Sequence, residues 1–298
     1  MNKFIMMVGL PGSGKSTLAK QVSKKNNAVI HSSDDMRQEL FGDENDQQNN
    51  ELLFQELNKR INRDLRDGKS VVYDATNLSY RRRKLYLDTI KTECYKECIL
   101  VATPYEKCLH QNNNRSRKVP KHVMEKMYRC FFVPQYYEGW DHIEIVFNTD
   151  EKYELDELFN DLDKISQDNM YHSLTIGEHC KKCAKYIEEQ YNDETLKMAA
   201  LLHDIGKKFT KKFEDRKGNP TEEAHFYSHQ NVSAYLSLFY LKNMPIEKII
   251  EITNYIQWHM QPFNLTTGKA KIKSAKLLGR EVYDNLLKLH EADVRAKA

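Results

Sequence analysis

The sequence lacks any long apolar run and any large excess of one charge sign. No segment approaches the roughly 18 consecutive apolar residues that a membrane-spanning helix needs, and no secretory signal is recognisable. We therefore expect a soluble cytoplasmic protein without a membrane partner. The formal net charge of +3 over 298 residues excludes a histone-like polycation but permits a nucleic-acid partner.

Cysteine is also scarce, with six residues in the chain. Without a secretory signal we expect reduced thiols, not a disulfide framework. Cys94 and Cys98 form one close pair and Cys180 and Cys183 another, but neither pair has partner cysteines at the spacing of a zinc ribbon. A structural zinc site made of cysteines is therefore not expected. Internal repeats and a Lys-x-Asp-Gly ligase signature are absent as well.

The first 150 residues alternate short apolar runs with segments of helical periodicity. This is the pattern of an α/β domain in which helices flank a parallel sheet. The expected strands are 3–8, 27–31, 71–74, 97–103 and 143–147. The expected helices between them are 51–65, 79–92 and 121–132, and Thr103-Pro104 suits the start of another.

After residue 150 the pattern changes to helices alone. We expect them at 151–165, 174–191, 193–203, 222–241, 246–259 and 270–297. The chain is long enough for two domains, each with its own core. This places an α/β domain at 1–150, a helical connector at 151–168 and an all-α domain at 169–298. Seven of the eleven histidines fall between 172 and 290, which indicates chemistry in the helical half.

The segment 9–17 has the Gly-x-x-x-x-Gly-Lys-Ser spacing of a phosphate-binding P-loop, between an apolar strand and a helix. Backbone N–H groups of such a loop cradle nucleotide phosphates. Lys15 is expected to reach the β- and γ-phosphates of ATP, and Ser16 to hold Mg²⁺, while the helix N-terminus adds positive potential. The residues expected to bind ATP here are Gly9, Pro11, Gly12, Ser13, Gly14, Lys15, Ser16 and Thr17.

Polar residues also follow the second and third expected strands. Asp34 and Arg37 are three residues apart and share a face of a helical turn. The carboxylate can accept a proton from an attacking hydroxyl, and the guanidinium can bind an acceptor phosphate. A solvated helix-capping sequence is the alternative. Asp74 ends the third strand, where its carboxylate can reach Mg²⁺ or cap the next helix.

These motifs resemble those of the kinase domain of phage-type polynucleotide 5′-kinases, which heal RNA and DNA ends. The resemblance covers nearly all of residues 3–148. It comprises the P-loop, Ser33-Asp34-Asp35-Met36-Arg37, Asp74-Ala75-Thr76-Asn77-Leu78, Arg81-Arg82-Arg83 and the lid 112–120. It implies that Asp34 is the general base, that Arg37 contacts the acceptor phosphate and that Arg115 is a lid arginine.

The chain departs from that family at one lid position. The first lid arginine aligns with Gln111, and Arg117 is the alternative that could replace it. The basic run 81–84 fits either an RNA-backbone contact or exposed helix charge.

In the second half, Leu201-Leu202-His203-Asp204-Ile205-Gly206-Lys207 resembles the signature of the HD phosphohydrolase superfamily. The resemblance implies an all-α domain with metal ligands from separate helices. These ligands are His179, His203, Asp204 and Asp293. Imidazole and carboxylate donors suit Mn²⁺, Ni²⁺, Co²⁺, Fe²⁺ or Zn²⁺ better than Mg²⁺. A metal bound in this way lowers the pKa of a water and directs hydroxide at phosphorus.

Further residues in this half fit a phosphate contact or a second metal. They are Lys207, His225, His229 and His259. His225 and His229 are four apart and would share one helical face, although ordinary surface or core histidines are the alternative. His172, two helical turns before His179, is an alternative first ligand.

Together the two halves predict a bifunctional enzyme that heals RNA ends. Ribonucleases leave a 5′-OH and a 2′,3′-cyclic phosphate. The kinase half would phosphorylate the first and the HD half would remove the second, or a 3′-phosphate, so that a separate ligase can join the ends. The expected partners are RNA ends, including tRNA-like RNA, or DNA ends. The main alternative is a small-metabolite or nucleoside kinase fused to an HD nucleotide phosphohydrolase, and a nucleotide-sensing regulator is a third.

Overall fold

The computed structural model describes residues 1–115, 117–170 and 173–297. The chain divides into two compact units. The first contains Met1–Tyr128 and Pro134–Thr149, and the second contains Arg129–Val133 and the chain from Asp150 onward. The second unit thus includes five residues that interrupt the first in sequence. Among the described residues, no helix is both long and apolar enough to span a bilayer.

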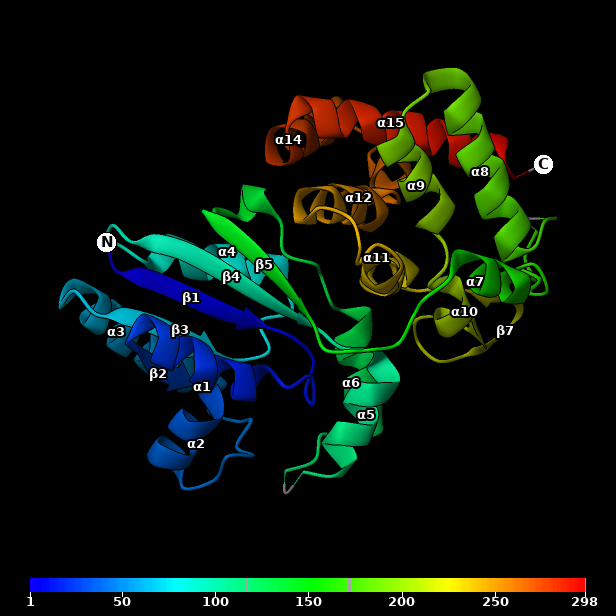
Figure 1. The fold of residues 1–298 in the computed structure, drawn as a ribbon. Helices are drawn as coiled ribbons and strands as arrows, with labels where there is room; N and C mark the ends of the chain where they lie inside the picture. Colours follow the sequence, from blue (N-terminus) through cyan, green and yellow to red (C-terminus); the bar gives the residue numbers. More distant parts are fainter. Residues whose placement is uncertain (116, 171–172, 298) are drawn as a thin grey trace. The chain divides into compact units, whose positions relative to one another are not determined.

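A five-stranded parallel sheet forms the centre of the first unit (Figure 1). Its strands are β1 Lys3–Val8, β2 Ala28–Ser32, β3 Ser70–Asp74, β4 Tyr95–Ala102 and β5 His142–Phe147, in the order β2-β3-β1-β4-β5. Helices cover both faces of such a sheet, so a central strand such as β1 is apolar on both sides. The register sets Asp74 beside Met7 of β1 and beside Ser32 of β2. The carboxyl ends of these three strands therefore lie at one edge.

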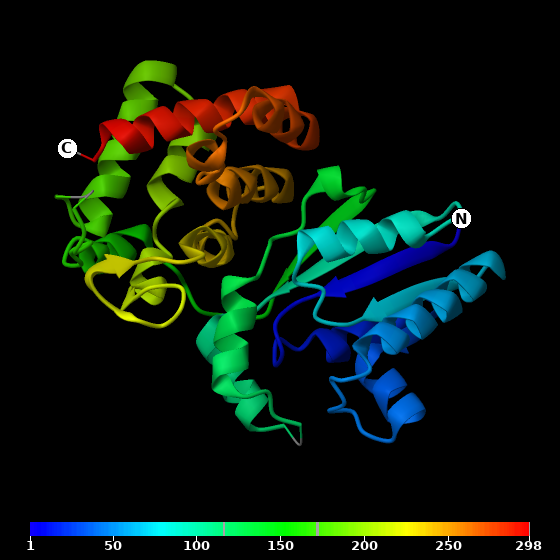
Figure 2. The ribbon, with the colours of Figure 1, turned by 180° about the vertical axis from the view of Figure 1, so that it is seen from behind.

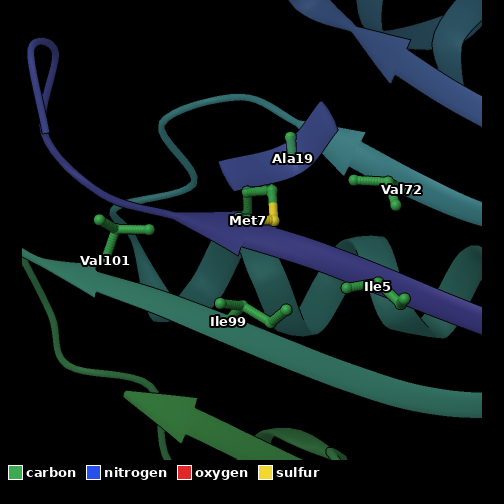
Figure 3. Close-up of a cluster of buried hydrophobic side chains, with 6 residues drawn as sticks. All are labelled: Ile5, Met7, Ala19, Val72, Ile99 and Val101. Atoms are coloured by element: carbon green, nitrogen blue, oxygen red, sulfur yellow. The ribbon is translucent and has the colours of Figure 1, made fainter. Parts of the chain in front are cut away.

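Helices pack on both faces of this sheet. On one face Ala19 of α1 (Lys15–Asn26) lies in a buried apolar cluster (Figure 3). The other members of the cluster are Ile5, Met7, Val72, Ile99 and Val101. On the other face Tyr86 of α4 (Tyr80–Thr89) stacks on Tyr73, with ring centroids 4.8 Å apart. The Thr89 hydroxyl of α4 donates a hydrogen bond to Asn58 of α3 (Asn50–Arg66) at 2.8 Å, so α3 and α4 are neighbours.

The second unit is built mainly of helices (Figures 1 and 2). They are α7 Leu155–Leu162, α8 Ile176–Tyr191, α9 Glu194–Leu202, α10 Lys207–Thr210, α11 His229–Tyr240, α12 Ile246–Trp258, α13 Gln261–Asn264, α14 Gly268–Leu278 and α15 Arg280–Arg295. The first unit further contains α2 Ser33–Phe41, α5 Tyr105–Asn113, the 3-10 helix η1 Tyr136–Glu138 and all but the last residue of α6 Lys121–Arg129. The expected fold class, an α/β domain followed by a helical region, is confirmed.

Two expectations for the helical half are wrong. The expected helix 222–241 begins only at His229, because the residues before it form strand β7 (Pro220–His225), paired antiparallel with β6 (Lys212–Glu214). Exposed and half-buried residues alternate over the first four residues of β7, which is the period of a strand. The expected helix 270–297 is two helices, because Gly279 at φ 88° ends α14.

Candidate nucleotide site and metal centre

The P-loop forms the turn between β1 and α1 at the carboxyl edge of the sheet. Gly12 and Gly14 have φ values of 76° and 88°, which side-chain-bearing residues rarely adopt. Two hydrogen bonds hold the loop at Ser13, whose carbonyl accepts from the Thr103 hydroxyl at 2.9 Å and the Asn148 amide at 3.0 Å. In a fixed loop of this conformation, the backbone N–H groups form a concave site that binds phosphate oxygens.

Lys15, Ser16 and Asp74 form a charged group beside the loop. Burial lowers the pKa of Lys15, and the Asp74 and Asp34 carboxylates oppose this shift. Burial raises the pKa of Asp74, opposed by the Lys15 charge and the Ser16 hydroxyl. Within the described chain, Asp74 Oδ1 has no hydrogen-bond partner. A buried carboxylate oxygen without a donor, next to a hydroxyl, fits a Mg²⁺ site that Ser16 and Asp74 would hold.

Asp34 lies between two arginines. Helix α2 begins here because the Ser32 hydroxyl accepts the Asp34 N–H and caps the helix. Arg37 Nη1 donates to Asp34 Oδ1 at 3.0 Å, and Arg37 Nη2 donates to Asn50 Oδ1 at 2.9 Å. Arg117 Nη1 pairs with the same Asp34 oxygen. Arg37 is buried, and no described residue accepts a hydrogen bond from its Nε.

The lid loop between α5 and α6 carries the two candidate lid arginines. Asn112 closes the loop: its side chain accepts the Val119 N–H at 3.0 Å and donates to the Val119 carbonyl at 2.9 Å. Arg115 lies close enough to Lys15 to contribute to the lowering of the Lys15 pKa. The structure thus brings Arg115 toward the P-loop and Arg117 to Asp34, whereas Gln111 stays within α5.

The interpretation of residues 81–84 as a basic surface is wrong for Arg83. Its guanidinium is fully buried and forms a fork with Glu138, with N–O distances of 2.7 and 2.6 Å. A third hydrogen bond, 2.8 Å long, runs to the Asn77 carbonyl. The Asn77 amide in turn donates to the Met7 carbonyl at 2.8 Å. Arg83 therefore holds the segment that follows Asp74, and only its neighbours Arg81 and Arg82 are exposed.

In the second unit, five helices deliver six side chains to one buried cluster. Their labels, α8, α9, α11, α12 and α15, can be followed in Figure 1. The residues are His179 on α8, His203 and Asp204 after α9, His229 at the start of α11, His259 after α12 and Asp293 on α15. Close packing of α11 explains Gly206, because a Cβ there would come within 2.5 Å of the His229 and Ser233 backbone.

Each histidine of this cluster bonds through Nδ1 to a backbone carbonyl. For His203, His229 and His259 the carbonyl belongs to the residue three positions earlier, at 2.7 Å in each case. For His179 it belongs to Ala296, at 3.4 Å. A carbonyl can only accept, so Nδ1 carries a proton, and in the neutral imidazole Nε2 keeps its lone pair. Such outer hydrogen bonds are those of metal-binding histidines.

The Nε2 lone pairs surround Asp204. Its Oδ2 lies 3.3 Å from His203 Nε2 and 3.4 Å from His179 Nε2. Its Oδ1 lies 3.1 Å from His229 Nε2 and 3.7 Å from His259 Nε2. Among the residues the structure describes, His203 Nε2 and Asp204 Oδ1 make no hydrogen bond. Apart from the Lys207 ammonium, which lies 2.7 Å from Asp204 Oδ2, acceptor atoms therefore face one another in this buried cluster.

This donor set fits divalent cations. The Nε2 atoms of His229 and His259 are 3.1 Å apart, an arrangement that repels unless positive charge lies beside them. Burial and the neighbouring imidazoles lower the pKa of His259 to about 3, which favours the neutral ligand form. One ion would be held by His179, His203, Asp204 and Asp293, and a second by His229 and His259 with Asp204.

The other sequence candidates lie in different surroundings. Lys207 is buried, and its ammonium lies 2.7 Å from Asp204 Oδ2 and 2.6 Å from Gln167 Oε1. His225 does not share a helix with His229, because it lies on β7 and stacks on Tyr227 at 5.3 Å. His172 lies outside the described residues.

Comparison with known proteins agrees with this division. The AAA domain family matches residues 4–134 and the HD domain family matches residues 169–297. The chain is a P-loop kinase-like domain fused to an HD domain. A P-loop kinase implies ATP and Mg²⁺, and HD domains bind divalent metals.

Individual relatives match parts of the fusion. L-seryl-tRNA(Sec) kinase of Methanococcus maripaludis is 30% identical over 171 residues, which cover 55% of this chain and 66% of that kinase. A chain of the Pnkp1/Rnl/Hen1 RNA repair complex is 25% identical, covers 42% of each chain and has a TM-score of 0.39. A gluconokinase from Sinorhizobium meliloti is 13% identical over 50% of this chain and 84% of its own, with a TM-score of 0.37. The fusion therefore spans less than two thirds of the seryl-tRNA kinase and of the repair-complex chain.

Sequence reasoning missed supporting residues in both domains. In the kinase-like domain, Asn50 and Asn112 hold Arg37 and the lid through side-chain amides. In the HD domain, Gln167 holds Lys207 from 40 residues away. Asparagine and glutamine have no characteristic spacing for such contacts, so no sequence signal could have found them.

Proposed function

We propose that the protein heals RNA ends: it phosphorylates 5′-OH ends with ATP and removes 2′,3′-cyclic phosphate or 3′-phosphate ends with a divalent metal. The observation that carries this proposal is Asp34, held between Arg37 and Arg117 near Lys15 of the P-loop. A carboxylate flanked by guanidinium groups suits an acceptor that brings a hydroxyl and a phosphate together. A nucleotide sensor needs no such group.

In the kinase-like domain, the proposed roles follow from these contacts. Asp34 accepts the proton of the attacking 5′-OH, and the Nε of Arg37, which bonds to no described residue, is a donor for the acceptor phosphate. Lys15 stabilises charge on the transferred phosphoryl group, and Arg115 supports it from the lid. The similarity to a kinase of L-seryl-tRNA(Sec) supports an acceptor hydroxyl carried on RNA.

In the HD domain, the histidines and carboxylates around Asp204 hold the metal. When bound, a divalent ion supplies a hydroxide nucleophile and offsets charge on the phosphoryl oxygens. The carbonyl bonds at Nδ1 keep each imidazole oriented with Nε2 toward the cluster. The buried ammonium of Lys207 lies beside Asp204. It can donate a hydrogen bond to an oxygen of the scissile phosphate in place of the Asp204 carboxylate.

The two activities complement each other on one substrate. A broken RNA strand presents both a 5′-OH and a cyclic phosphate, and conversion of both ends yields the pair that a separate ligase joins. A metabolite kinase would require no matching hydrolase for the opposite end of its substrate.

An oligoribonucleotide with a 5′-OH and a 2′,3′-cyclic phosphate tests the proposal. We expect incubation with ATP, Mg²⁺ and Mn²⁺ to yield a 5′-phosphate and to open and remove the cyclic phosphate. A matching deoxyribonucleotide, free nucleosides and gluconate serve as competing acceptors. Preferential phosphorylation of a nucleoside or sugar, with the RNA left unchanged at both ends, would overturn the proposal in favour of a metabolite kinase.

A further inference from the structure

Cys183 lies among the candidate metal ligands of the HD domain, although it belongs to no part of the HD signature. It is fully buried on α8, one helical turn after His179. Its Sγ is 3.7 Å from His179 Nε2. One donor atom each from Cys183, His179, His203 and Asp293 lie within 4.8 Å of one another.

Two distances among these donors match those between atoms that bind one metal ion. Metal–sulfur and metal–imidazole bonds of about 2.3 and 2.0–2.1 Å place the two donor atoms about 3.6 Å apart at the tetrahedral angle. The observed distance from Cys183 Sγ to His179 Nε2 is 3.7 Å. His179 Nε2 and Asp293 Oδ1 are likewise 3.2 Å apart.

A second, independent feature points into the same space. His203 Nε2 is completely buried and makes no hydrogen bond to any described residue, while its Nδ1 donates to a carbonyl. A buried imidazole lone pair without a donor is costly unless a cation or proton meets it. The sulfur therefore lies beside lone pairs that a shared ion would satisfy.

We propose that Cys183 is a direct sulfur ligand of the HD-domain metal and that it biases the site toward Zn²⁺ and Co²⁺ over Mn²⁺ and Mg²⁺. This inference rests on the proposed metal centre. Thiolate is a soft donor, which favours Zn²⁺ and Co²⁺ over the harder ions. The thiol hydrogen, which now faces the Ala292 carbonyl at 3.6 Å, would leave to solvent as a proton when the metal–sulfur bond forms.

Cys180 provides a matched control. It is equally buried and lies three residues earlier on the same helix, but it is not a member of the cluster among the described residues. A Cys180→Ser change therefore removes a buried thiol of α8 without removing the proposed ligand.

The test uses full-length protein stripped with a chelator and reloaded with one equivalent of Co²⁺. We expect wild-type and Cys180→Ser proteins to show a near-ultraviolet sulfur-to-cobalt charge-transfer band, and Cys183→Ser to bind Co²⁺ without it. Loss of a residue that only hydrogen-bonds to a metal ligand lowers metal affinity roughly 10- to 100-fold. In competition assays the Zn²⁺ affinity of Cys183→Ser should fall by at least this factor. Its Mn²⁺ affinity should change little.

X-ray absorption of zinc-loaded wild-type protein gives a second measurement that needs no variant. It should show a sulfur neighbour at about 2.3 Å. Only nitrogen and oxygen neighbours, or a charge-transfer band that persists in Cys183→Ser or disappears in Cys180→Ser, would overturn the role of Cys183 and leave the metal centre intact. Failure of the wild-type protein to bind any Co²⁺ or Zn²⁺ would overturn the metal centre itself.

Discussion

Replacement of Arg83 by methionine tests whether this arginine is a structural part of the kinase-like domain or an RNA contact. Arg83 makes three hydrogen bonds of 2.6–2.8 Å, two to Glu138 and one to the Asn77 carbonyl. Both members of the ion pair are completely buried. Without Arg83, the donors that remain to Glu138 in the described part of the chain are Trp140 Nε1 and the Gln135 N–H, each at 3.1 Å.

The expected loss of stability is large. Removal of one partner from a buried ion pair costs about 3–5 kcal/mol, because the remaining charge stays desolvated and uncompensated. We expect the lower part of this range for Arg83→Met, since two donors to Glu138 remain. Against a domain stability of roughly 5–15 kcal/mol, such a loss reduces the folding equilibrium constant more than 100-fold. The double change Arg83→Met/Glu138→Leu should cost less than Arg83→Met alone.

Urea denaturation measures this effect within one domain. The chain has two tryptophans; Trp140 is buried beside Glu138, and Trp258 packs on Phe132 in the second unit. In a Trp258→Phe background, fluorescence therefore reports the unfolding of the kinase-like domain. Arg81→Ala is the exposed control and should change the free energy of unfolding by less than about 0.5 kcal/mol. A loss for Arg83→Met no larger than that of the control would refute the reasoning.

Three further predictions concern the two activities. Lys15→Ala and Asp34→Ala should each abolish 5′-phosphorylation. In Asp34→Ala, loss of the base should slow the reaction by roughly 10²–10⁴ while ATP binding is largely kept. Full kinase activity in Asp34→Ala would assign the role of base to another acid. Arg37→Ala should raise KM for oligonucleotides far more than for ATP, measured by initial rates, unless the acceptor carries no phosphate. His203→Ala should lose the metal, by elemental analysis, and phosphoesterase activity but keep the kinase; loss of both in a folded variant would indicate one composite site.

The fold followed from sequence where hydrophobic periodicity was strong. The five apolar runs before residue 150 became strands, and β1 formed with the bounds expected for it. The hairpin was missed because Thr221-Glu222-Glu223-Ala224 contains good helix formers, and only pairing with β6 makes it a strand. The helix break at Gly279 depends on a single residue with a positive φ, which hydrophobic periodicity does not reveal.

The sites divide along similar lines. The P-loop and the His203-Asp204 pair are local motifs, so their spacing in sequence is sufficient to find them. Arg83 looked like surface charge because its partner Glu138 lies 55 residues later, and a fork of this kind has no local signature. Arg117, the candidate to replace the first lid arginine, was distinguishable from Arg115 only through its ion pair with Asp34. A single sequence does not show which distant residues pair with its charged residues.

The five residues Arg129–Val133 determine whether the two domains can be encoded as separate chains. Phe131 and Val133 are completely buried, and the Phe131 ring meets that of Tyr235 at 4.6 Å. Gln257 bonds to the Val133 backbone, and Asn231 to the Arg129 carbonyl at 2.8 Å. A gene split near residue 150 would give a kinase fragment that displays these apolar side chains and a hydrolase fragment missing part of its core. Hydrolase activity made from residues 150 onward should therefore depend on co-expression of the other fragment.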